Sequence, residues 1–138
     1  MIKDLDKIIG RKINDVKLLI WNDESSAIMI EKILFEFDDC KFVLAVNSAT
    51  DEIIPRIFNN FKLVKREKEH KIINAENLSE YNLNCLIGKQ IIWIWTLINN
   101  QGYFDAIQIE IEKQETYQFL SIASQIEIKK VIKTKPSC

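Results

Sequence analysis

The sequence predicts an α+β fold with two similar halves, each a short helix followed by antiparallel β-strands in a meander, packed as one domain. Three observations lead to this prediction. A glycine-centred block occurs twice, an apolar run with helical spacing precedes each of these glycines, and most of the remaining chain alternates between apolar and polar residues. The chain has 138 residues, which is enough for one domain with a sizeable core.

The repeat is carried by two pairs of matching blocks. Residues 5–13 match residues 83–91, with apolar positions, a glycine and the following basic residue aligned at an offset of 78. Further on, residues 27–31 match residues 106–110 at an offset of 79, although a competing register at an offset of 74 also aligns two strands. Similarity between amphipathic strands can arise by chance, but the glycine-centred block is harder to obtain from alternation alone.

We therefore interpret the chain as a single domain of residues 1–138 with an internal repeat. The two copies span approximately residues 3–57 and 79–134, and the linker between them covers residues 58–78. At the centre of this linker, residues 65–71 carry mixed charge, which predicts a solvated linker or an exposed edge strand.

Each copy is expected to begin with a short helix. Residues 5–9 place their apolar side chains on one helical face, and Gly10 is suited to end that helix as a C-cap. In the second copy, a helix is expected over residues 77–87. Asn77 would be its N-cap, and Glu80 would complete the capping box.

Strands are expected wherever apolar and polar residues alternate between turn signals. In the first half they cover residues 13–21, 28–37, 41–46 and 51–57. In the second half they cover residues 91–98, 103–112, 116–123 and 125–132. Pro55 restricts its strand to a sheet edge or a bend, because proline has no N–H for the ladder. Hairpin-linked strands of this kind form an antiparallel sheet.

Residues 93–108 form the candidate binding site. Two tryptophans share one face of the first strand, and since both faces are largely apolar we expect this strand to be central and covered on both sides. The segment is open to two interpretations: a recognition surface at a hairpin tip, or a core strand followed by a well-specified turn. The predicted binding residues are Trp93, Trp95, Asn99, Asn100, Gln101, Tyr103, Asp105 and Gln108.

Little in the sequence indicates catalysis or a bound cofactor. His70, the single histidine, lies in the charged run, and no phosphate-binding, dinucleotide or nucleophile-elbow motif occurs. The acidic residues that could pair for acid–base catalysis or hold a metal are Asp38, Asp39, Asp51, Glu52 and Asp105. Turns and strand starts explain most of these positions better. We predict no enzymatic activity, no catalytic residues, no cofactor and no metal site.

Composition limits the partners and the compartment. The formal net charge of -1 argues against a nucleic-acid binder that works through a global positive field. Acidic residues near the N-terminus and the lack of a long apolar stretch argue against a signal peptide and a membrane span. The three cysteines, Cys40, Cys85 and Cys138, lack metal-ligand spacing, which predicts reduced thiols. We expect a cytoplasmic protein without a nucleic-acid or membrane partner.

A specific motif runs through the candidate site: a glycine, a Trp-x-Trp strand and a turn of the form Asn-x-Gln-Gly-Tyr-x-Asp. Its residues are Gly88, Trp93, Trp95, Asn99, Gln101, Gly102, Tyr103, Asp105 and Gln108. In this motif the chain resembles a family of small bacterial proteins of unknown function, from which it departs at Ala106, where that family often has glycine. The resemblance implies an α+β fold and a bacterial source, and no activity.

In size and style the chain is also similar to the immunity proteins of bacterial toxin systems. We therefore expect a non-enzymatic protein-binding module that neutralises a toxin-like protein by occluding it. The alternative is a small-ligand-binding or structural dimeric module, so the protein is expected to be a monomer or a homodimer. A deep apolar pocket beside the tryptophans would favour a ligand, whereas a flat self-complementary face would favour dimerisation.

Overall fold

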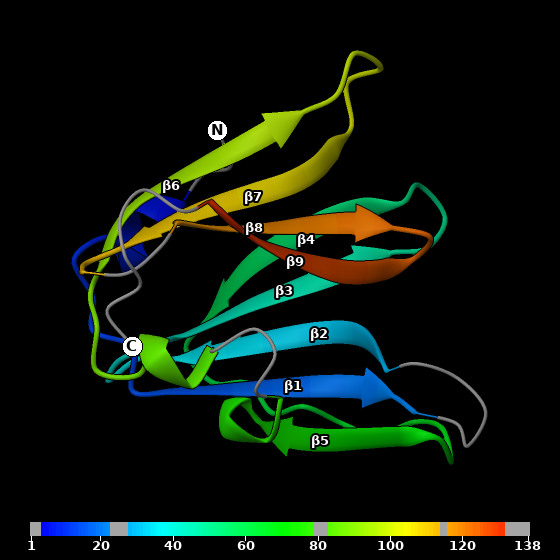
Figure 1. Cartoon of the computed structure of the whole chain (residues 1–138), viewed down its shortest axis with the longest axis horizontal. Helices are drawn as coiled ribbons and strands as arrows, with labels where there is room; N and C mark the ends of the chain where they lie inside the picture. Colours follow the sequence, from blue (N-terminus) through cyan, green and yellow to red (C-terminus); the bar gives the residue numbers. More distant parts are fainter. Residues whose placement is uncertain (1–3, 23–27, 79–82, 114–115, 132–138) are drawn as a thin grey trace.

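The computed structural model describes residues 4–22, 28–78, 83–113 and 116–131. Within these residues the fold is almost entirely antiparallel β (Figure 1), so the predicted α+β class is wrong. The helical elements are the short 3₁₀ turns η1 (Leu5–Ile8), η2 (Ala75–Asn77) and η4 (Leu83–Leu86). The strands are β1 (Asp15–Trp21), β2 (Met29–Glu36), β3 (Lys41–Asn47), β4 (Glu52–Phe58), β5 (His70–Asn74), β6 (Ile91–Ile98), β7 (Phe104–Ile111), β8 (Thr116–Ile122) and β9 (Gln125–Val131).

The first helical prediction fails because η1 stops after one turn. It is entered from Asp4 in the left-handed region at φ 85°, and Ile9 after it is extended at ψ 130°. A spacing of three and four residues over so few positions fits one 3₁₀ turn as well as the start of an α-helix. One turn still buries Leu5 and Ile8, and their burial in the core stabilises it rather than helix propagation.

The helix predicted over residues 77–87 is also wrong. Asn77 is the last residue of η2 rather than an N-cap, and Leu78 has the non-helical angles φ -124° and ψ 73°. The next helical element among the described residues is η4, which buries Leu83 and Leu86. Glu80, the expected capping partner, lies outside the described residues.

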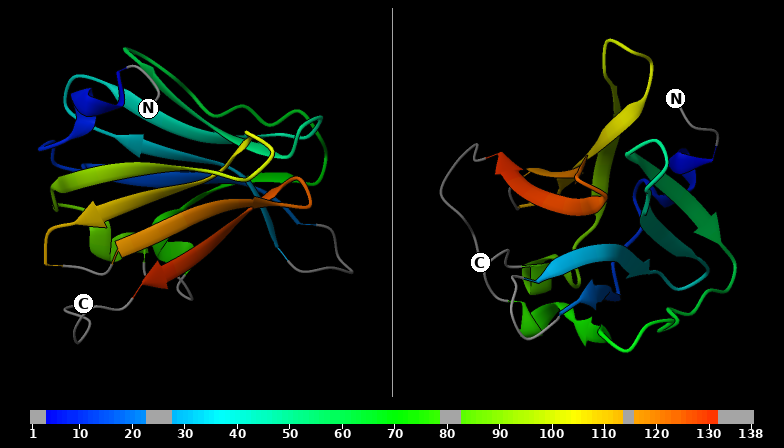
Figure 2. Two further views of the ribbon diagram at one scale, coloured as in Figure 1. Left: turned by 90° about the horizontal axis from the view of Figure 1, so that it is seen from above. Right: turned by 90° about the vertical axis from the view of Figure 1, so that its right-hand side faces the viewer.

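Each half of the chain contributes a four-stranded meander to one sheet, which is curled (Figures 1 and 2). β1 to β4 pair consecutively, as do β6 to β9, and every pair is antiparallel, which confirms the predicted antiparallel sheet. These eight strands begin and end within two residues of the predicted bounds. The two meanders meet where Ile30 of β2 pairs with Ile126 of β9, and where β4 lies beside β7.

The segments around Gly10 and Gly88 hold each other through reciprocal backbone hydrogen bonds. The N–H of Gly10 donates to the carbonyl of Ile91, and the N–H of Gly88 donates to the carbonyl of Ile13, both at 2.7 Å. The glycines have φ angles of 82° and 86°. Equivalent contacts at an offset of 78 residues therefore join the starts of the two meanders, while the common origin of the halves stays a prediction.

The main core lies inside the curl of the sheet and is dominated by aromatic rings. Phe35, Phe42, Tyr117 and Phe119 are among its largest fully buried side chains. The ring centroid of Phe35 lies 5.7 Å from that of Phe42 and 5.9 Å from that of Phe119, the latter at an interplanar angle of 86°. Because Phe35 is on β2 and Phe119 is on β8, this edge-to-face contact joins the two meanders.

Residues 59–69, which we call the strap, pack on the outer face of the first meander. Leu63 is 5% exposed and packs on Leu19, Leu34 and Val43, which come from three neighbouring strands. The ring of Phe61 stacks on that of Phe58 at a centroid distance of 4.9 Å. The strap therefore builds a second, smaller hydrophobic cluster and is not simply solvated. After it, β5 pairs with β1 at the sheet edge.

Candidate functional site

The tryptophan strand lies at an edge of the sheet, not at its centre. β6 pairs with β7 and ends the strand order, so the prediction of a strand covered on both faces is wrong. In β6 only Ile91 and Ile94 are buried. Five large apolar side chains, which we call the β6 surface, are at least 37% exposed: Ile92, Trp93, Trp95, Leu97 and Ile98. Contiguous apolar exposure of this kind is typical of an interaction surface.

A register shift explains why the tryptophans are exposed. Strict alternation from the buried Ile91 would bury Trp93 and Trp95 on the same face. The pairing of β6 with β7 shifts between Ile91 and Trp93, so Ile92 has no opposite residue in the ladder. This extra residue reverses the phase of the strand, with the result that Ile94 is buried and both indole rings face outward.

The hairpin turn after β6 is organised by Asn99, as the turn prediction requires. Its side-chain Oδ1 accepts the N–H groups of Gln101 at 2.9 Å and Tyr103 at 3.1 Å, and its own N–H donates to the Tyr103 carbonyl at 2.9 Å. Gly102 sits in the turn at φ 90°. Asn100, Gln101 and Tyr103 are exposed at the tip, which projects beyond the rest of the sheet (Figure 2).

The remaining predicted site residues lie on β7. Gln108 is opposite Trp95 in the ladder, and its Oε1 accepts a hydrogen bond of 2.6 Å from the side chain of Gln118. Asp105 is half-buried at a second register shift, between Leu97 and Ile98 on the partner strand, and has no opposite residue. The structure thus brings Trp95 and Gln108 side by side and places the tip residues at the end of the same hairpin. Their role in binding stays a prediction.

His70 makes a structural contact that the sequence did not reveal. It is 8% exposed, and its Nδ1 accepts the N–H groups of Arg66 and Glu67, both at 3.1 Å. Its Nε2 lies 2.7 Å from Oε2 of Glu31, and the Trp21 ring packs edge-on at 5.4 Å. Since Nδ1 accepts two hydrogen bonds, it carries no proton, and Nε2 is the nitrogen whose N–H faces Glu31. Nδ1 therefore anchors the end of the strap, while Nε2 lies close to Glu31 on β2 without a hydrogen bond of regular geometry.

The acidic residues considered for catalysis or metal binding are dispersed. Among the described residues, no three His, Cys, Asp or Glu side chains group as metal ligands. The hydrogen bond from Ser121, followed by that from the Ser124 N–H, lowers the pKa of Asp51. Four of the carboxylates each bind a different neighbour: Asp38 accepts from Asn14 at 2.6 Å, Asp39 pairs with Arg11 at 2.8 Å, Asp51 accepts from Ser121 at 2.5 Å, and Glu52 accepts from the Phe104 N–H at 3.1 Å.

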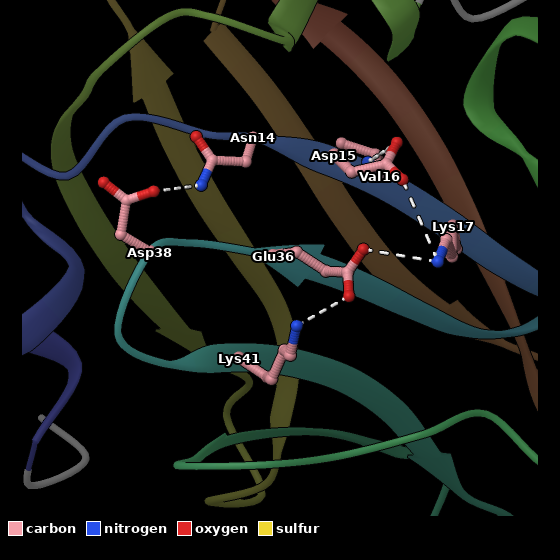
Figure 3. A network of polar contacts seen from close by, with 7 residues as sticks. All are labelled: Asn14, Asp15, Val16, Lys17, Glu36, Asp38 and Lys41. Carbon is pink, nitrogen blue, oxygen red and sulfur yellow. Dashed lines mark hydrogen bonds and ion pairs between the residues drawn. The ribbon is translucent and has the colours of Figure 1, made fainter.

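A network of charged side chains lies on the outer face of the first meander (Figure 3). Oε1 of Glu36 accepts a hydrogen bond of 2.7 Å from Lys41, and its Oε2 lies 3.4 Å from Nζ of Lys17. The hydrogen bond from Lys41 is the main cause that lowers the pKa of Glu36. The charge of Lys17 acts in the same direction, and partial burial opposes both.

We expect Glu36→Gln to lower the free energy of unfolding at pH 7 by about 0.5–1 kcal/mol, as for a partly screened ion pair. The folded-state pKa of Glu36 lies below the unfolded value of 4.5, so its stabilisation is present above that value and is lost as pH falls through the folded pKa. The loss should therefore shrink at about pH 3. Urea unfolding at both pH values measures it, with the exposed Glu76→Gln as control. A loss that is equal at both pH values would contradict this account.

The structure also bears on the predictions of no membrane span and of reduced cysteines. No helix in the described part of the chain is long and apolar enough to cross a membrane. Cys40 is free, and burial is the main cause that raises the pKa of its thiol. Cys85 is disulfide-bonded, so the prediction of a reduced thiol is wrong there. Cys138 lies outside the described residues.

Comparison with known protein families gives a match over nearly the whole chain. A family model described as a family of unknown function (DUF6334) matches residues 1–135. No curated protein and no solved structure matches the chain. The family match spans the glycine-centred blocks, the tryptophan strand and the hairpin turn.

Proposed function

The chain belongs to the DUF6334 family, a family of unknown function, and we propose that it is a non-enzymatic protein-binding module that engages its partner through β6. The expectation of a family of unknown function is confirmed. The observation that carries the proposed role is the β6 surface, where five large apolar side chains lie on one sheet edge. Binding is favoured over catalysis because this surface offers contact area and main-chain hydrogen bonds.

The edge of β6 can accept an added strand. At its first residue, Ile91, the N–H and carbonyl already bond to Arg11 and Gly10. From Trp93 to Ile98 no other strand in the described residues pairs with this edge. An extended segment of a partner would bond to the exposed main chain, while Trp93 and Trp95 supply buried contact area beside it. Tryptophan is among the residues most often responsible for binding energy at interfaces.

We propose that the partner is a toxin-like protein and that the chain acts as an immunity protein of a bacterial, cytoplasmic toxin system. The similarity of size and style to immunity proteins supports this role. A rigid sheet edge that binds a segment next to an active centre would occlude it without any chemistry. Asn100, Gln101 and Tyr103 at the projecting tip would form the polar rim of such an interface.

Replacing both tryptophans tests the proposal. The candidate partner is the product of the gene adjacent to the one for this chain, and its affinity is measured by isothermal titration calorimetry. We expect Trp93→Ala combined with Trp95→Ala to weaken binding at least about 30-fold, which corresponds to a single interface hot spot. Leu97→Lys should weaken it as well, because a charged side chain on a sheet edge disfavours strand addition.

Val64→Ala is the matched control, since Val64 is an apolar side chain that is 57% exposed and belongs to the strap, which packs on the first meander and not on β6. It should leave the affinity unchanged. Circular dichroism of each variant checks that the fold is retained. A double tryptophan variant that is folded and binds the partner as tightly as the unaltered chain would refute the proposed interface.

A structural homodimer is the second candidate, because β6 carries no charged residue and can pair antiparallel with β6 of another copy. Size-exclusion chromatography with light scattering separates the two. A dimer that the double tryptophan variant converts to a monomer would favour the structural role. A chain that is monomeric at all concentrations would favour the heterologous partner.

The small-ligand alternative required a pocket beside the tryptophans, and the cavities described below are lined by residues of β2, β3, β4 and the strap or by η1 and β4.

A further inference from the structure

A groove on the outer face of the first meander encloses about 310 Å³. Its floor is apolar and is formed by Val43 and Ala45 of β3 and Ile54 of β4. Phe58 and Phe61, whose rings stack at a centroid distance of 4.9 Å, form one wall. The volume lies at the lower end of the range for small-molecule sites, and the composition is typical of them.

The two charged side chains that line this groove are both cations, Lys32 and Arg56. The strand register places them on either side of the floor, because Lys32 is opposite Ala45 and Arg56 is opposite Val43. Within the described ranges, neither cation forms an ion pair and no carboxylate lines the groove. The groove therefore presents uncompensated positive charge next to an apolar floor.

A neighbouring cavity provides a contrast. It encloses about 400 Å³ and shares Phe58 and Arg56 with the first groove, and it is also lined by Asp4 and Lys7. These two side chains form an ion pair of 3.9 Å, so the charge of Lys7 is compensated there. The excess of positive charge over an apolar surface is thus greater in the first groove.

We propose that the groove binds an amphipathic organic anion, a carboxylate or similar group attached to a small aromatic or aliphatic body. The body would lie on the apolar floor against the stacked phenylalanines, and Lys32 and Arg56 would hold the anionic group through charge-assisted hydrogen bonds. The groove is lined by residues of β2, β3, β4 and the strap and shares no residue with the β6 surface, so this site is independent of the proposed partner.

The test uses 2-naphthoate as the probe and the isosteric neutral 2-naphthamide as its comparison. Amide chemical shifts of the ¹⁵N-labelled full chain are followed during titration. We expect 2-naphthoate to shift the amides of Val43, Ala45 and Arg56 and to bind at least about tenfold more tightly than the amide, the factor expected when a charge-assisted hydrogen bond is gained. Lys32→Gln combined with Arg56→Gln should remove this preference.

Lys129→Gln is the matched control, because Lys129 is an exposed lysine of the second meander that pairs with no carboxylate in the described part of the chain. It should retain the full preference for the anion. Ala45→Trp fills the floor and should abolish binding of both probes; if this variant does not fold, the charge-removing pair decides the question alone. Equal affinity of the unaltered chain for the two probes would overturn the proposal. So would an anion preference that persists without the two cations, or shifts confined to the β6 surface.

Discussion

Phe119→Ala is expected to lower the free energy of unfolding by about 3–5 kcal/mol, the range for deleting a fully buried aromatic side chain. Phe119 is 0% exposed, and its ring contacts Tyr117 on its own strand and Phe35 on β2. Removing the ring leaves a cavity at the place where the two meanders pack on each other. Urea unfolding at 25 °C, followed by circular dichroism, measures the loss.

Ile122→Ala provides the comparison on the same strand. Ile122 is 42% exposed, so its truncation should change the free energy of unfolding by no more than about 0.5 kcal/mol. Both variants should unfold in a single transition, because buried residues of both meanders, such as Phe42 and Ile107, belong to one hydrophobic core. Two separate transitions, or equal losses in the two variants, would contradict this description of the core.

Gly88→Val and Gly10→Val are each expected to lower the free energy of unfolding by about 2 kcal/mol, the cost of holding a branched residue in the left-handed region. The two glycines have φ angles of 86° and 82°. A Cβ atom at either position meets no atom within 4 Å, so the cost arises from backbone strain and not from a clash. Because the two segments exchange equivalent hydrogen bonds, the two losses should be similar. Urea unfolding of both variants measures them.

Lys12→Val is the control for these glycine variants. Lys12 lies between the same hydrogen bonds, opposite Gln90, but is not among the residues with positive φ. Its replacement should cost clearly less than either glycine replacement. If Lys12→Val and Gly88→Val were equally destabilising, the left-handed backbone would not be the reason that glycine is required.

The double variant of Gly10 and Gly88 adds a test of their contact. The N–H of Ile13 donates to the Lys89 carbonyl, and the N–H of Ile91 donates to the Arg11 carbonyl, so the two glycines act within one set of bonds. The loss in free energy of unfolding of the double variant should therefore differ from the sum of the two single losses by more than about 0.5 kcal/mol. Additive losses would mean that the two segments respond independently.

Much of the fold was predictable from local pattern. Alternating residues such as Ile107, Ile109 and Ile111 placed strands within two residues of their observed bounds, and the turn at Asn99 formed where polar residues and a glycine interrupt the alternation. The two helices failed because one apolar turn before a glycine is compatible with both α and 3₁₀ geometry. Nothing in so short a segment decides between them, since burial in the core stabilises either.

By itself, the sequence determined which residues form strands and turns and where glycine is required, because these depend on neighbours along the chain. Only the tertiary structure decided which faces are covered. The unpaired Ile92 reverses the phase of β6 and turns Trp93 and Trp95 outward, and the register of three strands brings Lys32 and Arg56 to the same apolar floor. Alternation distinguishes the two faces of a strand, but long-range pairing and bulges decide which face water reaches.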